Sequence, residues 1–213
     1  KDFYDNHVRP LFQSQFGFIA IAKYNGKKPY YGVCSERANV CAALTKLGVP
    51  IGVKKELSVP SWIKKNRRYM AAFIRGAIDT DGSLFCGKDY NYPKNKHKKV
   101  RMSFVNISST FVKEVSEGLK LFGIHNLIIK PYKSKISHLG TLNKIEINGP
   151  NVIDYMRIIG SKNPKHNSKF EVWKRFGFCP PYTTLEQRQK ILNNQLDPEE
   201  FYARVSEWSN EPG

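Results

Sequence analysis

The chain has 213 residues, enough for one sizeable domain or two small ones, and a hydrophobic content of 40% argues against an intrinsically disordered protein. Its net charge of +17 indicates a polyanionic partner, most often nucleic acid. No apolar run approaches the roughly 18–20 residues of a membrane span, and no signal peptide is visible, so we expect an intracellular protein of the cytoplasm or nucleoid. The four scattered cysteines are expected to be reduced thiols and not zinc ligands.

A diverged internal repeat organises the sequence. The first copy begins with a predicted helix, "DFYDNHVRPLFQSQFG", and continues with a predicted hairpin, "FIAIAKYNGKKPYYGVCS", that turns at Asn25 and Gly26. A second helix, "RANVCAALTKLG", stops at Gly48, where glycine follows the last apolar residue of the helical pattern.

The second copy has an additional beginning, which consists of a helix over about 66–79 and strands over about 83–88 and 100–107. It then repeats the pattern of the first copy with the helix "STFVKEVSEGLKLFG", the hairpin "NLIIKPYKSKISHLGTLNKIEING", which turns near His138–Gly140, and a helix that ends at Gly160. The pattern predicts an α+β fold of helix–strand–strand–helix–strand–strand–helix, with the helices on one face of an antiparallel sheet.

Alternation along the strands predicts which side chains face the helices. Val100, Met102 and Phe104 are expected on the apolar face, and Arg101, Ser103 and Val105 on a polar, basic face. In the later hairpin the expected apolar set is Leu127, Ile129, Ile145 and Ile147, which leaves Lys130, Lys144 and Glu146 on the opposite face.

Three regions follow from this organisation. Residues 1–65 are expected to be a partial first repeat with its linker, and residues 66–176 a complete second repeat. Residues 177–213 are expected to be a C-terminal helical tail, in which Thr183 and Glu186 would form a capping box.

Residues 71–83, "AAFIRGAIDTDGS", combine a small-residue face with two acids. Ala72, Gly76 and Thr80 lie at i, i+4 and i+8, a spacing that lets a second helix approach closely. Asp79 and Asp81 fall at the helix C-terminus, where the dipole disfavours negative charge, so they indicate a metal or proton role. Two such helices side by side would gather carboxylates suited to Mg²⁺.

An EF-hand is the alternative reading of this motif. With Gly82 at its sixth position, the calcium loop requires an acid at Ala77 and a glutamate at Lys88, and both are absent.

Residues 74–82, "IRGAIDTDG", resemble the motif of the LAGLIDADG homing endonucleases. The matching positions are Ile74, Gly76, Ile78, Asp79, Asp81 and Gly82, and the differing ones are Arg75, Ala77 and Thr80. The segment "LGVPIGVKKELSVPSWI" is also similar to the linker of two-repeat archaeal members. The resemblance covers nearly all of residues 1–176.

The resemblance implies a site-specific double-strand DNA endonuclease that binds a long target on a twisted antiparallel sheet. It implies that Asp81 and the backbone carbonyl of Thr80 hold Mg²⁺ or Mn²⁺, with Asp79 in support. Asn106 occupies a catalytic position where Gln-Lys is usual, and Ile107 stands in place of the lysine. The enzyme would be encoded in an intron or stand free.

Basic and aromatic side chains in the second repeat predict a ribbon that lies in the DNA major groove. The candidate DNA-binding residues are Lys88, Lys96, Lys98, Lys99, Arg101, Ser103, Lys130, Tyr132, Lys133, Lys135, Lys144 and Lys165. Lys169 is a further candidate phosphate contact.

The first repeat lacks its motif helix, and the chain begins at Lys1 and not at Met. We therefore expect a fragment of a pseudo-symmetric monomer whose first motif lies upstream, or otherwise a homodimer. The alternative function is an RNA maturase that binds intron RNA, or a DNA-binding protein that keeps the fold without cleaving.

Overall fold

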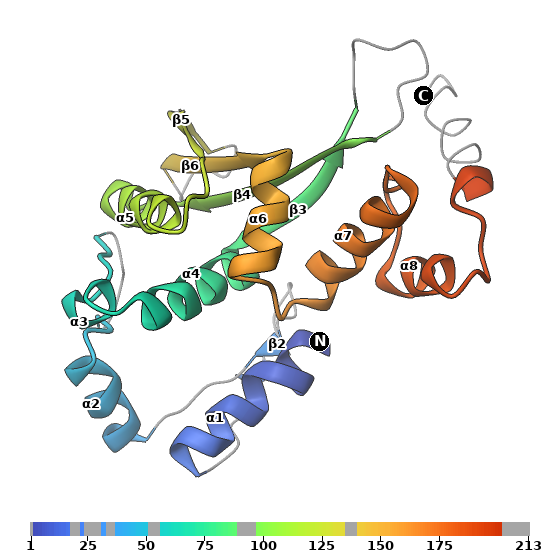
Figure 1. Ribbon diagram of the computed structural model, residues 1–213. Coiled ribbons are helices and arrows are strands. Elements are labelled where there is room, and N and C mark those ends of the chain that lie inside the picture. Colours follow the sequence, from blue (N-terminus) through green and yellow to red (C-terminus); the bar gives the residue numbers. More distant parts are fainter. Residues whose placement is uncertain are drawn as a thin grey trace.

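The computed structural model describes residues 2–17, 22–23, 31–32, 37–50, 56–88, 97–134 and 140–201 (Figure 1). Its elements in chain order are η1 (Tyr4–Val8), α1 (Arg9–Phe16), β1 (Ala22–Lys23), β2 (Tyr31–Gly32), α2 (Ala38–Lys46), α3 (Ser61–Lys64), α4 (Arg67–Asp81), β3 (Gly82–Gly87), β4 (Lys99–Asn106), α5 (Ser109–Lys120), β5 (Leu127–Lys133), β6 (Thr141–Asn148), α6 (Pro150–Ile158), α7 (Pro164–Phe176) and α8 (Leu185–Leu192). The predicted α+β class and the order of elements in the second repeat are confirmed.

A four-stranded antiparallel sheet is the centre of the fold, with strand order β3-β4-β6-β5. Helices α4, α5 and α6 lie on one side of it (Figure 1). Between the two layers the alternating residues of β4, namely Val100, Met102 and Phe104, are almost fully buried, as predicted. The other face of the sheet, which we call the open face, carries the residues that alternate with these, such as Arg101, Ser103 and Val105 on β4.

Helix α4 begins where the side chain of Asn66 accepts hydrogen bonds from the amides of Arg68 and Tyr69. Met70, Ile74 and Ile78, spaced by four residues, are buried against the sheet and α5. Helix α5 approaches closely at Gly118, because a Cβ there would lie 2.9 Å from Cδ1 of Ile74. The helix is therefore fixed along one side.

The predicted facing of β5 is wrong by one residue. Leu127 pairs with Glu146, Ile128 with Ile145, and Ile129 with Lys144. Because paired residues share a face, Leu127 and Ile129 lie on the open face and Ile128 lies on the helix side. Ile145 and Ile147 are buried as predicted, and Lys144 and Glu146 lie on the open face.

The first copy is helical over η1 and α1, pairs β1 with β2 antiparallel, and continues with α2, as its pattern predicts. Gly48 follows α2 with a φ of 91°, a conformation that favours glycine. The predicted turn at Asn25 and Gly26 lies outside the described residues. The division into two repeats and a tail remains a prediction.

Two features at the C-terminal side differ from the prediction. Helix α7 was not predicted, and it begins at the cap Asn163 with Pro164 in its first turn. The capping box of α8 joins Thr184 with Gln187, and not Thr183 with Glu186. None of the helices in the described ranges is long and apolar enough to cross a membrane.

Candidate active site and nucleic-acid interface

Asp81 is the last residue of α4, and Gly82 begins β3 without an intervening loop. Gly82 is required by close approach, because a Cβ there would lie 2.5 Å from the carbonyl oxygen of Ile78. Its φ of −92° is ordinary, so the requirement is steric. The tight junction holds Asp81 at the point where the helix meets the edge of the sheet.

The Asp81 side chain is exposed and makes no hydrogen bond or ion pair with the described residues. Partial loss of solvent around its carboxyl group raises the pKa of Asp81 above its ordinary value. An unpaired carboxylate at this place favours the approach of a cation.

The residues at this end of α4 fit a hard divalent metal. Mg²⁺ prefers oxygen ligands and commonly takes one or two carboxylates together with waters. Asp81 offers a carboxylate, and the Thr80 carbonyl lies beyond the last hydrogen bond within the helix, which Gly82 donates to Ile78. Within the described ranges no three His, Cys, Asp or Glu side chains gather as a metal site.

Asp79, by contrast, is buried and tied to the connection between α6 and α7. Its carboxylate accepts hydrogen bonds from the Ser161 hydroxyl at 2.5 Å and the Lys162 amide at 2.7 Å. Its backbone carbonyl accepts one from the Asn163 side chain at 2.8 Å. The His166 imidazole lies 3.6 Å from the same carboxylate. We call Ser161, Lys162, Asn163 and His166 the Asp79 clamp.

The sequence predicts a supporting role for Asp79 but does not identify the residues that it contacts. The structure shows these partners. The clamp residues lie 82 or more positions after Asp79 in the chain. They fix the last turn of α4 against α7, and with it the orientation of the next residues, Thr80 and Asp81.

The clamp gives a testable dependence on pH. Burial alone would raise the pKa of Asp79, but the His166, Ser161 and Lys162 groups lower it below its ordinary value. A carboxylate with a lowered folded-state pKa stabilises the fold above its unfolded-state pKa, and this stabilisation is lost as the pH falls through the folded-state pKa. We expect Asp79→Asn to cost about 2–3 kcal/mol of unfolding free energy at neutral pH.

The measurement is denaturant unfolding of both proteins from neutral pH down through the acidic range. The difference between wild type and Asp79→Asn should shrink as Asp79 becomes protonated. Asp154→Asn, which removes an exposed acid on α6, is the control and should leave the curve almost unchanged. A constant difference at every pH contradicts a stabilising Asp79 charge.

The small-residue face of α4 is accessible in the described part of the chain. Ala72, Gly76 and Thr80 are exposed, and a Cβ added at Gly76 would meet no atom within 4 Å. The Thr80 hydroxyl donates to the Gly76 carbonyl at 3.0 Å, which keeps this side chain against its own helix. The face predicted to contact a second helix is therefore free to do so.

A small hollow of about 150 Å³ lies beside Thr80. Phe3 and Tyr4 from the N-terminal helix, together with Asn163 and Lys165 from the start of α7, also line it. Lys165 is exposed and stands at the same end of α4 as Asp81. Its role as a phosphate contact remains a prediction.

Asn106 has a local structural role in this arrangement. Its side-chain oxygen accepts a hydrogen bond from the Ser108 amide at 2.9 Å, and it pairs with Asn143 on β6. In register it shares the helix side of the sheet with Phe104. It makes no hydrogen bond with Asp81, and its predicted catalytic role remains a prediction.

Apart from Lys165, the candidate DNA-binding residues fall into three groups. By strand register, the first group lies on the open face: Lys99, Arg101, Ser103, Tyr132 and Lys144. The second group does not lie there: Lys88 and Lys98 flank strand ends, Lys130 lies at an irregularity of β5, and Lys133 lies on the helix side of β5. The third group, Lys96 and Lys135, lies outside the described residues. Ser103 is buried, and its hydroxyl lies 2.9 Å from that of Ser83. Lys169 turns inward, and its amine donates to the Leu84 carbonyl at 3.0 Å.

The basic end of the sheet is distant from Asp81. Gly82 pairs with Phe104 and Gly87 pairs with Lys99, so five strand residues, about 17 Å, separate the two ends. Lys98 and Arg101 form no ion pair with the described residues, which leaves their charges available to phosphate. A ligand that reaches both ends must therefore be extended.

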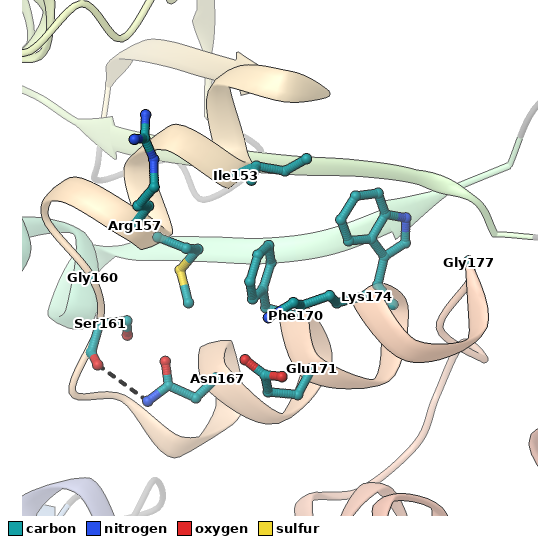
Figure 2. A pocket seen from close by; sticks show the side chains of 11 residues that line it. Ile153, Arg157, Gly160, Ser161, Asn167, Phe170, Glu171, Lys174 and Gly177 are labelled. Carbon is teal, nitrogen blue, oxygen red and sulfur yellow. Dashed lines mark hydrogen bonds between the residues drawn. The ribbon is translucent and has the colours of Figure 1, made fainter.

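A larger groove of about 760 Å³ lies between α6 and α7. Figure 2 shows Phe170 within it, Arg157 on the α6 side, and the hydrogen bond of 3.1 Å from Asn167 to the Ser161 carbonyl. Because Ser161 lines it, the groove borders the Asp79 clamp. Asp81 does not line it.

Comparison with known proteins identifies one region. Residues 68–166 match the family model of the LAGLIDADG-like domain. The match begins in α4 and ends in α7, so it contains the sheet, Asp81 and the clamp. No curated protein matches the chain significantly.

Proposed function

Because residues 68–166 match the family model of the LAGLIDADG-like domain, we propose that the protein is a site-specific double-strand DNA endonuclease that uses Mg²⁺ or Mn²⁺. The observation that carries the proposal is Asp81, an unpaired carboxylate held by a loopless junction at the end of a helix with an open small-residue face. A bound metal would activate water and neutralise charge on the leaving oxygen. Asp81 and the Thr80 carbonyl would hold the metal in place.

The proposed site is completed by a second helix against Ala72, Gly76 and Thr80. That helix would come from a first motif upstream or from a second copy of the chain. Two helices in contact along these faces would bring two Asp81-type carboxylates together, and one cation site could then serve each DNA strand. The extended DNA ligand would run from there along the open face toward Lys99 and Arg101.

The test uses the protein together with any coding sequence that precedes Lys1. It is incubated with a plasmid library of genomic fragments that includes intron insertion sites, with Mg²⁺ or with a chelator. We expect Mg²⁺-dependent linearisation of a small set of plasmids, with both strands cut. Absence of cleavage combined with tight binding of intron RNA contradicts the nuclease proposal and supports the maturase alternative.

A further inference from the structure

The open face of the sheet has two chemically different parts. Toward β3 and β4 it carries the basic residues Lys99 and Arg101. Toward β5 and β6, and at the C-terminal end of β4, it carries apolar side chains, which we call the apolar patch. The patch consists of Val105, Leu127, Ile129, Tyr132 and Leu142.

Strand register places these side chains in rows. Val105, Lys144 and Ile129 lie opposite one another on three adjacent strands, and Tyr132 lies opposite Leu142. Leu127 is 59% exposed and Tyr132 is 42% exposed. The patch is thus an accessible surface that the fold of the described residues does not cover.

The charges within the patch cancel. Lys144 forms an ion pair with Glu146, two positions along the same face, and these side chains are only 23% and 17% exposed. This part of the open face is therefore balanced in charge over the side chains that strand register places on it, in a chain whose net charge is +17. It is poorly suited to bind phosphate, although it continues directly from a basic surface.

A ligand that spans both parts must present phosphates to one and apolar groups to the other. The major groove of DNA does this, because its edges carry the 5-methyl groups of thymine beside the phosphate backbones. Arg101, which has no acidic partner in the described ranges, supplies the complementary charge. Charge complementarity of the adjoining surface therefore favours DNA over an apolar protein partner.

We propose that the apolar patch reads thymine methyl groups, so that the part of the target under β5 and β6 requires A·T or T·A pairs. The proposal rests on the DNA-binding function proposed above. Leu127 and Ile129, two residues apart on one strand, are separated by about 7 Å, or roughly two base-pair steps. The requirement should accordingly fall on neighbouring positions of one flank.

The experiment starts from duplexes selected for binding out of a randomised pool, without cleavage. Each thymine in a selected duplex is then replaced by deoxyuracil, which removes only the methyl group. We expect binding to weaken about threefold to fourfold per methyl at two or more positions of one flank. The double variant Leu127→Ala/Ile129→Ala should bind the thymine and uracil duplexes equally.

Arg101→Ala is the matched control, because it should weaken both duplexes by the same factor. Equal binding of wild type to thymine and uracil duplexes at every position overturns the methyl readout but leaves DNA binding intact. A change of oligomeric state in the double variant, with no uracil effect, overturns it in favour of a protein interface. Failure of the wild-type protein to bind any duplex removes the proposed function as well.

Discussion

Asp81→Asn abolishes cleavage and leaves DNA affinity within roughly tenfold, about 1.4 kcal/mol, if Asp81 holds the metal as we expect. Asparagine keeps the size of the side chain but loses the charge that attracts a divalent cation. Asp81 makes no hydrogen bond or ion pair with the described residues, so the fold should be unaffected. Single-turnover cleavage, duplex binding and denaturant unfolding are measured on the same preparation.

Asp154→Asn provides the matched control for this loss of charge. Asp154 lies on α6, where it forms a surface ion pair with Arg157, and its removal changes the net charge by the same amount. The control should cleave at the wild-type rate. If Asp81→Asn also cleaves at that rate, Asp81 does not belong to the catalytic centre.

Gly82→Ala is expected to cost about 2–3 kcal/mol of unfolding free energy, typical of overpacking against atoms that cannot move aside. The added Cβ would lie 2.5 Å from the Ile78 carbonyl oxygen and 2.8 Å from Cγ2 of Ile78. Relief requires the end of α4 to separate from the start of β3. Denaturant unfolding monitors the stability, and metal-dependent cleavage should fall with it because Asp81 shifts.

Gly76→Ala makes the same chemical change six residues earlier in α4 and serves as the comparison. The added Cβ meets no atom within 4 Å, and alanine favours the helix by roughly 0.5–1 kcal/mol relative to glycine. We therefore expect unchanged or higher stability, but weaker cleavage, because the methyl group lies on the face that the second helix would contact. Equal stability of Gly82→Ala and wild type would rule out the steric account of the junction.

The parts of the fold with clear periodicity were predictable from the sequence. Helix α4 has buried residues at Met70, Ile74 and Ile78, and β4 alternates from Val100 to Phe104, so each pattern admits one orientation. Strand β5 contains three consecutive apolar residues, which fit either orientation, and a register irregularity follows between Ile129 and Tyr132. Sequence reasoning chose the wrong orientation there.

At the candidate site, too, the sequence predicts the local position of Asp79 and Asp81 but not the distant contacts of Asp79. The motif placed Asp81 at the end of the helix, as the structure has it. The partners of Asp79 come from a segment that is remote in sequence and polar in composition, and no local pattern connects them. Asn163 followed by Pro164 was the available signal, since these residues are typical of a helix start and mark the beginning of α7.

The loopless junction at Gly82 has a mechanical consequence. Helix α4 and strand β3 meet at consecutive residues, and the Asp79 clamp holds the helix end on its other side. No flexible loop lies between the strand that would touch the DNA and the carboxylate that would hold the metal. A bend or twist of the duplex that displaces β3 therefore tilts Asp81 directly, so the stiffness of the target sequence would be sensed at the reacting phosphate.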